Sequence, residues 1–280
     1  MKFGLKTLLA AAVTTALVGC NANDSTLNNS DNTASTLISA AQSTERSTAN
    51  QTRDQYRNPV ETLAFFGLQS NMTVVEIAPG GGWYSEILAP ALKGQGTFYA
   101  AHFPADSEVG YYQRSLSGFK EKVASDERFS EVKITEFSPI SHLDIAPASS
   151  ADMVLTFRNV HNWYMQKDHQ GVLSAFKAFN KALKPGGILG VVEHRLPESR
   201  DSADQKRSGY MKQSYVVDIA KQAGFELVAQ SDINANPNDS ADHPKGVWTL
   251  PPRLALGEEQ AAKYKAIGES DRMTLKFKKL

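Results

Sequence analysis

The sequence predicts an α/β fold with a doubly wound, mostly parallel sheet and an antiparallel last strand. Strand-like and helix-like segments alternate from residue 58 onward. The strand-like segments are near-continuous apolar runs, such as TVVEIA at residues 73–78, which is typical of parallel strands covered on both faces. The last two strand-like segments follow each other without a clear crossover helix, which favours an antiparallel pair at the end.

Each element has a local reason. Asn58 and Pro59 suit the cap and first turn of a helix, and Gly224 suits the end of one. Helices are predicted at residues 58–66, 83–92, 111–124, 168–183 and 210–223. Strands are predicted at residues 73–78, 97–103, 132–137, 152–157, 188–193, 225–231 and 273–277.

Composition and charge restrict the kinds of partner. The chain has 280 residues, of which 41% are hydrophobic, with 30 acidic residues against 30 Lys and Arg. This length is sufficient for one large domain with a buried core. Nucleic-acid partners usually select a basic face, and here the charges are balanced and interspersed. We therefore expect a small-molecule substrate and no nucleic-acid partner.

The N-terminus has the pattern of an export signal. Residues 1–20 carry two lysines, an apolar run and small residues before Cys20, the only cysteine. The ending LVGC resembles the lipobox of bacterial lipoproteins, which implies cleavage before Cys20 and a lipid anchor there. Residues 21–52 are rich in Asn, Ser and Thr and are predicted to be a flexible tether before a domain at residues 53–280. The expected location is the bacterial cell envelope, with the domain in the periplasm.

A run of glycines follows the first strand. Gly80, Gly81 and Gly82 stand between TVVEIA and the helix predicted at residues 83–92. Glycines permit positive φ angles and close approach to the backbone, and amides at a helix start can point toward a ligand. In doubly wound sheets, ligands bind at the carboxyl ends of the strands where the strand order reverses. A tight loop without a ligand is the alternative.

Three segments together carry a family resemblance: EIAPGGG at residues 76–82, DMVLTF at 152–157 and LKPGG at 183–187. From residue 54 onward the chain resembles the class I S-adenosylmethionine-dependent methyltransferases. The resemblance implies a seven-stranded sheet and S-adenosylmethionine as cofactor, with its methionine end over the glycine loop. The cofactor-binding residues it implies are Glu76, Ala78, Gly80, Gly81, Gly82, His102 and Asn159.

His102 departs from the family pattern. The family usually has Asp or Glu at the end of the second strand to accept hydrogen bonds from the ribose hydroxyls. A neutral imidazole accepts one hydrogen bond, less well than a carboxylate. On this interpretation His102→Asp is expected to tighten nucleoside binding.

The segment RNVHNWY, residues 158–164, supplies candidate catalytic side chains after the fourth strand. His161 is the candidate base for a protonated acceptor, Arg158 the candidate contact for an anionic substrate, and Asn159 or Asn162 a positioning group. The alternative is that these side chains only hold a loop in place. Aromatic faces of Trp83, Tyr84 and Trp163 would suit the sulfonium cation, with core packing as the favoured alternative for Trp83.

Glu193, His194 and Arg195 follow the fifth strand and are expected to form a rim of the same cleft, where Glu193 pairs with Arg158 or His161; a solvated strand end is the alternative. A metal bound by His102, His161 and His194 is not expected, because the second and fifth strands lie roughly 14 Å apart at ~4.8 Å per strand. The sequence thus favours methyl transfer to a small molecule, with a non-catalytic domain that binds another nucleoside or metabolite as the alternative.

The long irregular segment at residues 234–256 is rich in Pro, Asn and Asp and contains Trp248. Such a segment is either a lid over a site or plain turn structure.

Overall fold

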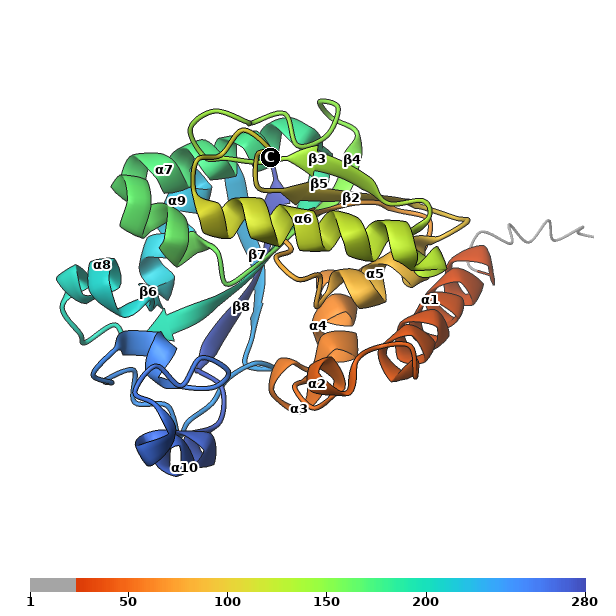
Figure 1. Cartoon of the computed structure of the whole chain (residues 1–280). Coiled ribbons are helices and arrows are strands. Elements are labelled where there is room, and N and C mark those ends of the chain that lie inside the picture. Colours follow the sequence, from red (N-terminus) through yellow and green to blue (C-terminus); the bar gives the residue numbers. More distant parts are fainter. Residues whose placement is uncertain (1–23) are drawn as a thin grey trace, which may run out of the picture.

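A computed structural model describes residues 24–280, with side chains described from residue 33 onward. The predicted export signal, including Cys20, therefore lies outside the described residues. No helix in the described part has the length and apolar character needed to cross a membrane. Figure 1 shows a central sheet with helices on both faces.

The sheet confirms the predicted topology. Its strands are β1 (Thr73–Ile77), β2 (Thr97–His102), β3 (Lys133–Glu136), β4 (Ala151–Phe157), β5 (Leu183–Leu196), β7 (Phe225–Ser231) and β8 (Arg272–Lys279), with the two-residue β6 (Met211–Lys212) beside the end of β5. The order is β3-β2-β1-β4-β5-β8-β7. Strands β1 to β5 pair in parallel, whereas β8 runs antiparallel to both β5 and β7. The strand order reverses between β1 and β4, which places the switch point beside the glycine loop.

Alternation along the strands divides the core into two layers. Val74 belongs to one apolar cluster and Val75 to the other, because successive strand side chains point to opposite faces. The helices are α1 (Asp24–Gln42), α2 (Thr48–Gln51), α3 (Asp54–Arg57), α4 (Pro59–Phe66), α5 (Ser85–Leu92), α6 (Gly110–Ser125), α7 (Val160–Ala182), α8 (Gln205–Ser208), α9 (Gln213–Gln222) and α10 (Glu258–Ile267), with short 3-10 turns at Glu127–Phe129, Ser202–Asp204 and Gly246–Thr249. Helices α1, α4 and α5 cover one face of the sheet, and α7 and α9 cover the other.

The segment predicted to be a flexible tether is instead part of the folded domain, so that prediction is wrong for residues 33–52. Leu37, Ala40 and Ala41 lie at helical spacing and are buried against α4 and α5. The buried Arg46 donates to both carboxylate oxygens of Asp54 at 2.7 and 2.9 Å and to Ala41 O at 2.6 Å. The Ser- and Thr-rich composition does not reveal this stripe, because one leucine and two alanines hardly change the average hydropathy. Figure 1 shows α1 beside α4 and α5.

Helix α7 begins earlier than predicted. The segment RNVHNWY forms its entry and first turns, and the chain then kinks at Lys167 and Asp168, where φ of Asp168 is +53°. The predicted helix at residues 168–183 corresponds to the part after the kink. Because Val160 and Trp163 are buried, the polar side chains between them are held on a rigid element.

Candidate functional site

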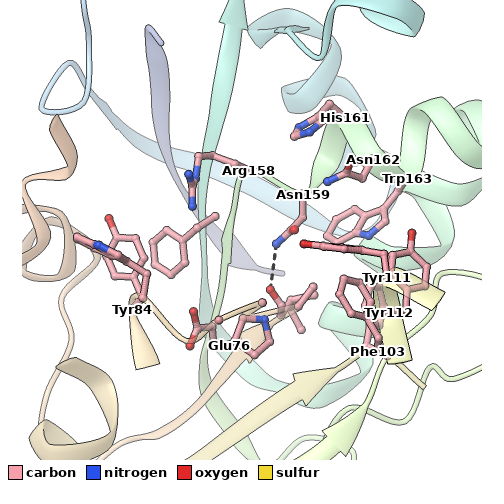
Figure 2. A pocket seen from close by; sticks show the side chains of 18 of the residues that line it. Glu76, Tyr84, Phe103, Tyr111, Tyr112, Arg158, Asn159, His161, Asn162 and Trp163 are labelled. Carbon is pink, nitrogen blue, oxygen red and sulfur yellow. Dashed lines mark hydrogen bonds between the residues drawn. The ribbon is translucent and has the colours of Figure 1, made fainter. Parts of the chain in front are cut away.

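A cavity of about 1070 Å³ opens at the carboxyl ends of β1, β2 and β4. Segments from distant parts of the sequence line it: α3, the glycine loop, the start of α7 and residues 247–253. Figure 2 shows labelled side chains from β1, from the segments that follow β1, β2 and β4, and from α6 and α7 around this space. Its position matches the switch point expected from the strand order.

The glycine loop combines left-handed backbone with open space. Ala78, Gly80 and Gly82 have φ angles of +48°, +60° and +80°. A Cβ built on Gly80 or Gly81 would meet nothing within 4 Å, so the backbone at both is open to a ligand. Gly82 does not line the cavity, and its Cβ would lie 3.0 Å from Phe119, which assigns it to packing. The loop thus uses Gly80 and Gly81 toward the cavity and Gly82 toward α6.

Glu76 and Asn159 lie beside this loop. Glu76 is buried and accepts a 2.5 Å hydrogen bond from Ser85 Oγ. Burial raises the pKa of Glu76 to about 7, against the opposing effects of Ser85 and Arg158. Asn159 donates from Nδ2 to Ile77 O at 3.0 Å, the contact drawn in Figure 2, and to Thr156 Oγ1 at 3.2 Å. With both amide hydrogens committed, Asn159 Oδ1 is the atom left to accept from a ligand.

His102 does not face the cavity. Its side chain is buried, Nε2 donates to Gly80 O at 3.0 Å, and Nδ1 accepts from the Phe103 N–H at 2.8 Å. Burial lowers the pKa of His102, so the neutral tautomer that these two partners require is favoured. Both ring nitrogens are therefore occupied by the protein, and the expected role as ribose acceptor is incompatible with this arrangement. His102 instead supports the glycine loop through its hydrogen bond to Gly80 O.

Aromatic rings form two walls of the cavity. Phe103 and Tyr112 stack with ring centres 4.0 Å apart, and Tyr84 stacks on Phe157 at 3.6 Å. Trp83, Tyr84 and Trp163, the three aromatic residues proposed from the sequence, all line the cavity. Sequence reasoning missed Phe103 and Tyr112, although both belong to an aromatic-rich stretch that follows β2. These flat faces suit a heteroaromatic base or a sulfonium cation.

His161 and Glu193 form a buried hydrogen-bonded pair. His161 Nδ1–H donates to Glu193 Oε1 at 2.9 Å, and the His161 backbone N–H donates to Oε2 at 3.2 Å. Of the pair, only His161 lines the cavity, so Glu193 acts behind it. The other ring nitrogen, Nε2, has no hydrogen-bond partner among the described residues. A carboxylate that fixes the tautomer and leaves Nε2 free is the arrangement of a general base.

The predicted rim is only partly formed. His194 lines the cavity next to His161, with ring centres 5.1 Å apart, while Arg195 turns away to pair with Asp271 and Asp232. Burial, together with His161 and Arg158, lowers the pKa of His194 well below its usual range.

His102 is absent from the local histidine cluster, but His161, Glu193 and His194 each offer a metal-ligand atom, and these atoms lie within 4.8 Å of one another. Both Glu193 oxygens already accept hydrogen bonds from His161, and Oε1 also accepts the His194 N–H, which favours a positioning role for this carboxylate.

Arg158 enters the cavity from the end of β4. Its φ is +62°, and its backbone N–H donates to Val192 O at 2.7 Å. Its guanidinium has no hydrogen bond or ion pair with any residue that the structure describes. Arg53 and Arg57, from the segment before α4, line the same cavity and were not predicted. Their spacing of four residues on a short helical stretch is the only sequence signal for them.

The segment at residues 234–256 contributes Val247, Trp248 and Leu250 to the cavity wall. Buried Asp239 anchors it, because this carboxylate accepts from Tyr210 OH at 2.9 Å and from the Asp271 N–H at 2.8 Å. Trp248 lies 6.1 Å from the His161 ring. Of the two alternatives, a loop over a site fits this segment better than plain turn structure, because the segment forms part of the cavity wall.

The fold was compared with known proteins. No protein-family model and no curated protein matches this chain by sequence. Solved structures do match: a SAM-dependent methyltransferase from Aquifex aeolicus has 15% identity and a TM-score of 0.53, over 81% of this chain and 93% of that one. A SAM-dependent methyltransferase from Methanosarcina mazei has 14% identity and a TM-score of 0.52, over 78% and 97%. The [4+2]-cyclase SpnF has 14% identity and a TM-score of 0.55, over 89% and 93%.

These similarities concern architecture, since the identities are low and one of the matched proteins is a cyclase. The mostly parallel sheet and the antiparallel β8 are consistent with this likeness. The chain has the Rossmann-like fold of the class I S-adenosylmethionine-dependent methyltransferases.

Proposed function

We propose that this protein transfers a methyl group from S-adenosylmethionine to a small molecule. One observation carries the proposal: the open glycine loop and the free Nε2 of the His161–Glu193 pair belong to the same cavity. A binding loop alone would serve any nucleoside, but a positioned base beside it is what a protonated acceptor requires.

The cavity walls suit this cofactor in part. Gly80 and Gly81 leave room beside the loop, Asn159 Oδ1 and Glu76 can accept from an ammonium group, and the rings of Phe103 and Tyr112 can flank a base. The occupied nitrogens of His102 leave the ribose without the family's usual acceptor. The fit is therefore stronger for the methionine and adenine parts than for the ribose.

When bound, the cofactor would supply a sulfonium methyl group, whose carbon would bond to the acceptor atom as the S–CH3 bond breaks and S-adenosylhomocysteine leaves in line. His161 Nε2 takes the proton of the acceptor as the new bond forms. Glu193 holds the Nδ1–H of His161 and stabilises the imidazolium that results. Trp248 and Trp163 exclude water from the base.

Calorimetric titration with S-adenosylmethionine and S-adenosylhomocysteine tests the cofactor assignment. We expect binding of both, with loss of affinity for Gly81→Val, whose side chain would occupy the open space, and little change for Gly118→Ala, which has equally open surroundings outside the cavity. Formation of S-adenosylhomocysteine from cell extract by wild type but not by His161→Asn would support the transfer step. Absence of binding at millimolar concentration would contradict the assignment and favour a domain that binds a different nucleoside or metabolite.

We further propose that the protein is an envelope lipoprotein anchored through acylated Cys20, on the strength of the LVGC ending alone. Labelling of cells with an alkyne-bearing fatty acid should mark the wild-type chain and not Cys20→Ala. Equal labelling of the two would contradict the anchor.

A further inference from the structure

Four guanidinium groups gather at one wall of the cavity around a single carboxylate. Glu269 accepts from Arg53 Nε at 2.6 Å, from Arg57 Nε at 3.2 Å and from Arg272 Nη2 at 2.8 Å. Arg158, without an ion pair to a described residue, is the fourth. Burial by itself would raise the pKa of Glu269, but the surrounding arginines outweigh it and lower this pKa to about 2. Glu269 is therefore ionised and still leaves most of the positive charge uncompensated.

Several of these guanidinium nitrogens are unsatisfied. Arg57 is 1% exposed, and both its Nη1 and Nη2 are buried without a hydrogen-bond partner among the described residues. The Nη2 of Arg53 is in the same state. Leaving buried charged donors unpaired costs free energy, so water, an ion or a ligand is expected to satisfy them. Stacking on Trp83, 4.6 Å from Arg57 Cζ, orients the Arg57 guanidinium but uses none of its hydrogens.

Glu76 does not compensate for this charge. Its raised pKa of about 7 means that it carries only part of a negative charge near neutral pH. The proximity of the cations also acts on the arginines themselves: burial and the neighbouring Arg272 lower the pKa of Arg158 to about 10. An anion bound among these groups would relieve their repulsion.

The proposed cofactor would not neutralise this wall. S-adenosylmethionine carries one carboxylate, but its ammonium and sulfonium groups give it a net positive charge. Its binding would add positive charge to a wall that already has an excess. The other reactant is the remaining source of a net negative charge.

We propose that the methyl acceptor carries a carboxylate or phosphate group that binds to Arg53, Arg57 and Arg158. This inference rests on the proposed function, since it names the class of molecule that shares the cavity with the cofactor. Planar guanidinium groups suit the oxygens of both anions through paired hydrogen bonds. His161 lies three residues after Arg158, in the first turn of α7, and both line the cavity. An anion held by Arg158 therefore places the rest of the acceptor near His161.

Anion binding can be measured without knowing the acceptor. We would follow thermal unfolding of the purified full-length protein with potassium phosphate or potassium acetate, against potassium chloride at equal ionic strength. Each series is repeated with saturating S-adenosylhomocysteine. Since phosphate also stabilises proteins by exclusion from their surface, the informative quantity is the difference between wild type and variants.

We expect wild type to be stabilised by phosphate beyond the chloride control, and the apparent dissociation constant to rise at least tenfold in Arg158→Gln. Arg53→Gln, a partly exposed position, should show the same loss and serves as a second variant if Arg158→Gln does not fold. Arg207→Gln is the matched control, because Arg207 is exposed and outside the cavity.

The cofactor product separates the possible outcomes. Phosphate stabilisation that persists with S-adenosylhomocysteine bound supports an acceptor site. Stabilisation that S-adenosylhomocysteine abolishes would mean that the arginines hold the cofactor's own carboxylate, and would overturn the inference. So would equal responses of wild type and both arginine variants. If S-adenosylhomocysteine alone does not bind while phosphate does, the proposed function fails and the anion site remains.

Discussion

Nδ1 of His161 lies 2.9 Å from Oε1 of Glu193, and both side chains are buried at the edge of the cavity. The same carboxylate accepts the backbone N–H groups of His161 and His194, so it holds the start of α7 against the end of β5. The Glu193 carboxylate therefore orients the His161 ring and also joins α7 to β5. Substitutions of Glu193 measure its contribution to stability.

Replacing this carboxylate should cost stability in proportion to the hydrogen bonds lost. Glu193→Ala leaves three N–H donors without an acceptor, and we expect the free energy of unfolding to fall by about 3–5 kcal/mol. Glu193→Gln retains a carbonyl oxygen and should cost about half as much. Urea denaturation monitored by tryptophan fluorescence measures both. Equal stability of wild type and Glu193→Ala would contradict the pairing.

Glu76 should make stability depend on pH. Its pKa in the folded protein, about 7, lies above its usual value, so the folded state binds the extra proton. Stability is therefore greatest at acidic pH on this account and falls as the pH rises from about 4.5 to 7. Glu76→Gln removes this loss and should be more stable than wild type at pH 8 by up to about 3 kcal/mol.

Denaturant titrations of wild type and Glu76→Gln at pH 5, 6, 7 and 8 would test the Glu76 prediction. Parallel pH profiles for the two proteins would show that Glu76 does not titrate in this range. Ser85→Ala is a useful companion, because loss of the 2.5 Å hydrogen bond from Ser85 Oγ should raise the pKa of Glu76 further.

The structure predicts that His102→Asp lowers the free energy of unfolding. The gain in nucleoside affinity that the family pattern implies is not expected. A carboxylate at this buried position would face the Gly80 carbonyl in place of the Nε2–H donor. We expect a loss of about 2–4 kcal/mol in unfolding free energy. His102→Gln retains a donor and serves as the control. Tighter binding of S-adenosylhomocysteine to a stable His102→Asp protein would reinstate the ribose role.

Two adjacent residues of α1 test whether the N-terminal segment belongs to the domain. Leu37 is 1% exposed and Ile38 is 43% exposed. Leu37→Ala should lower the free energy of unfolding by about 2–4 kcal/mol, whereas Ile38→Ala should stay within about 0.5 kcal/mol of wild type. Chemical denaturation of the two variants distinguishes a packed helix from a tether, for which neither substitution would matter.

The sequence by itself determined where the strands of the sheet lie along the chain. Short apolar runs such as residues 73–77 and 151–157 are buried on both faces, and their length and branched apolar composition identify them as strands without knowledge of their neighbours. The glycine loop could likewise be predicted, because the positive φ at Gly80 is a conformation that the local sequence permits. The candidate role of His161 followed from its place after a strand.

Tertiary structure alone decided which polar atoms remain free for a ligand. The sequence placed His102 where a ribose contact is expected, but its nitrogens are taken by Gly80 and Phe103, and only packing shows this. Arg53 and Arg57 come from a segment whose composition indicates only a surface position. Their hydrogen bonds to Glu269, more than 200 residues later in the chain, hold them at the cavity. Hydrogen-bond satisfaction and charge balance depend on contacts between distant segments, and no local pattern encodes them.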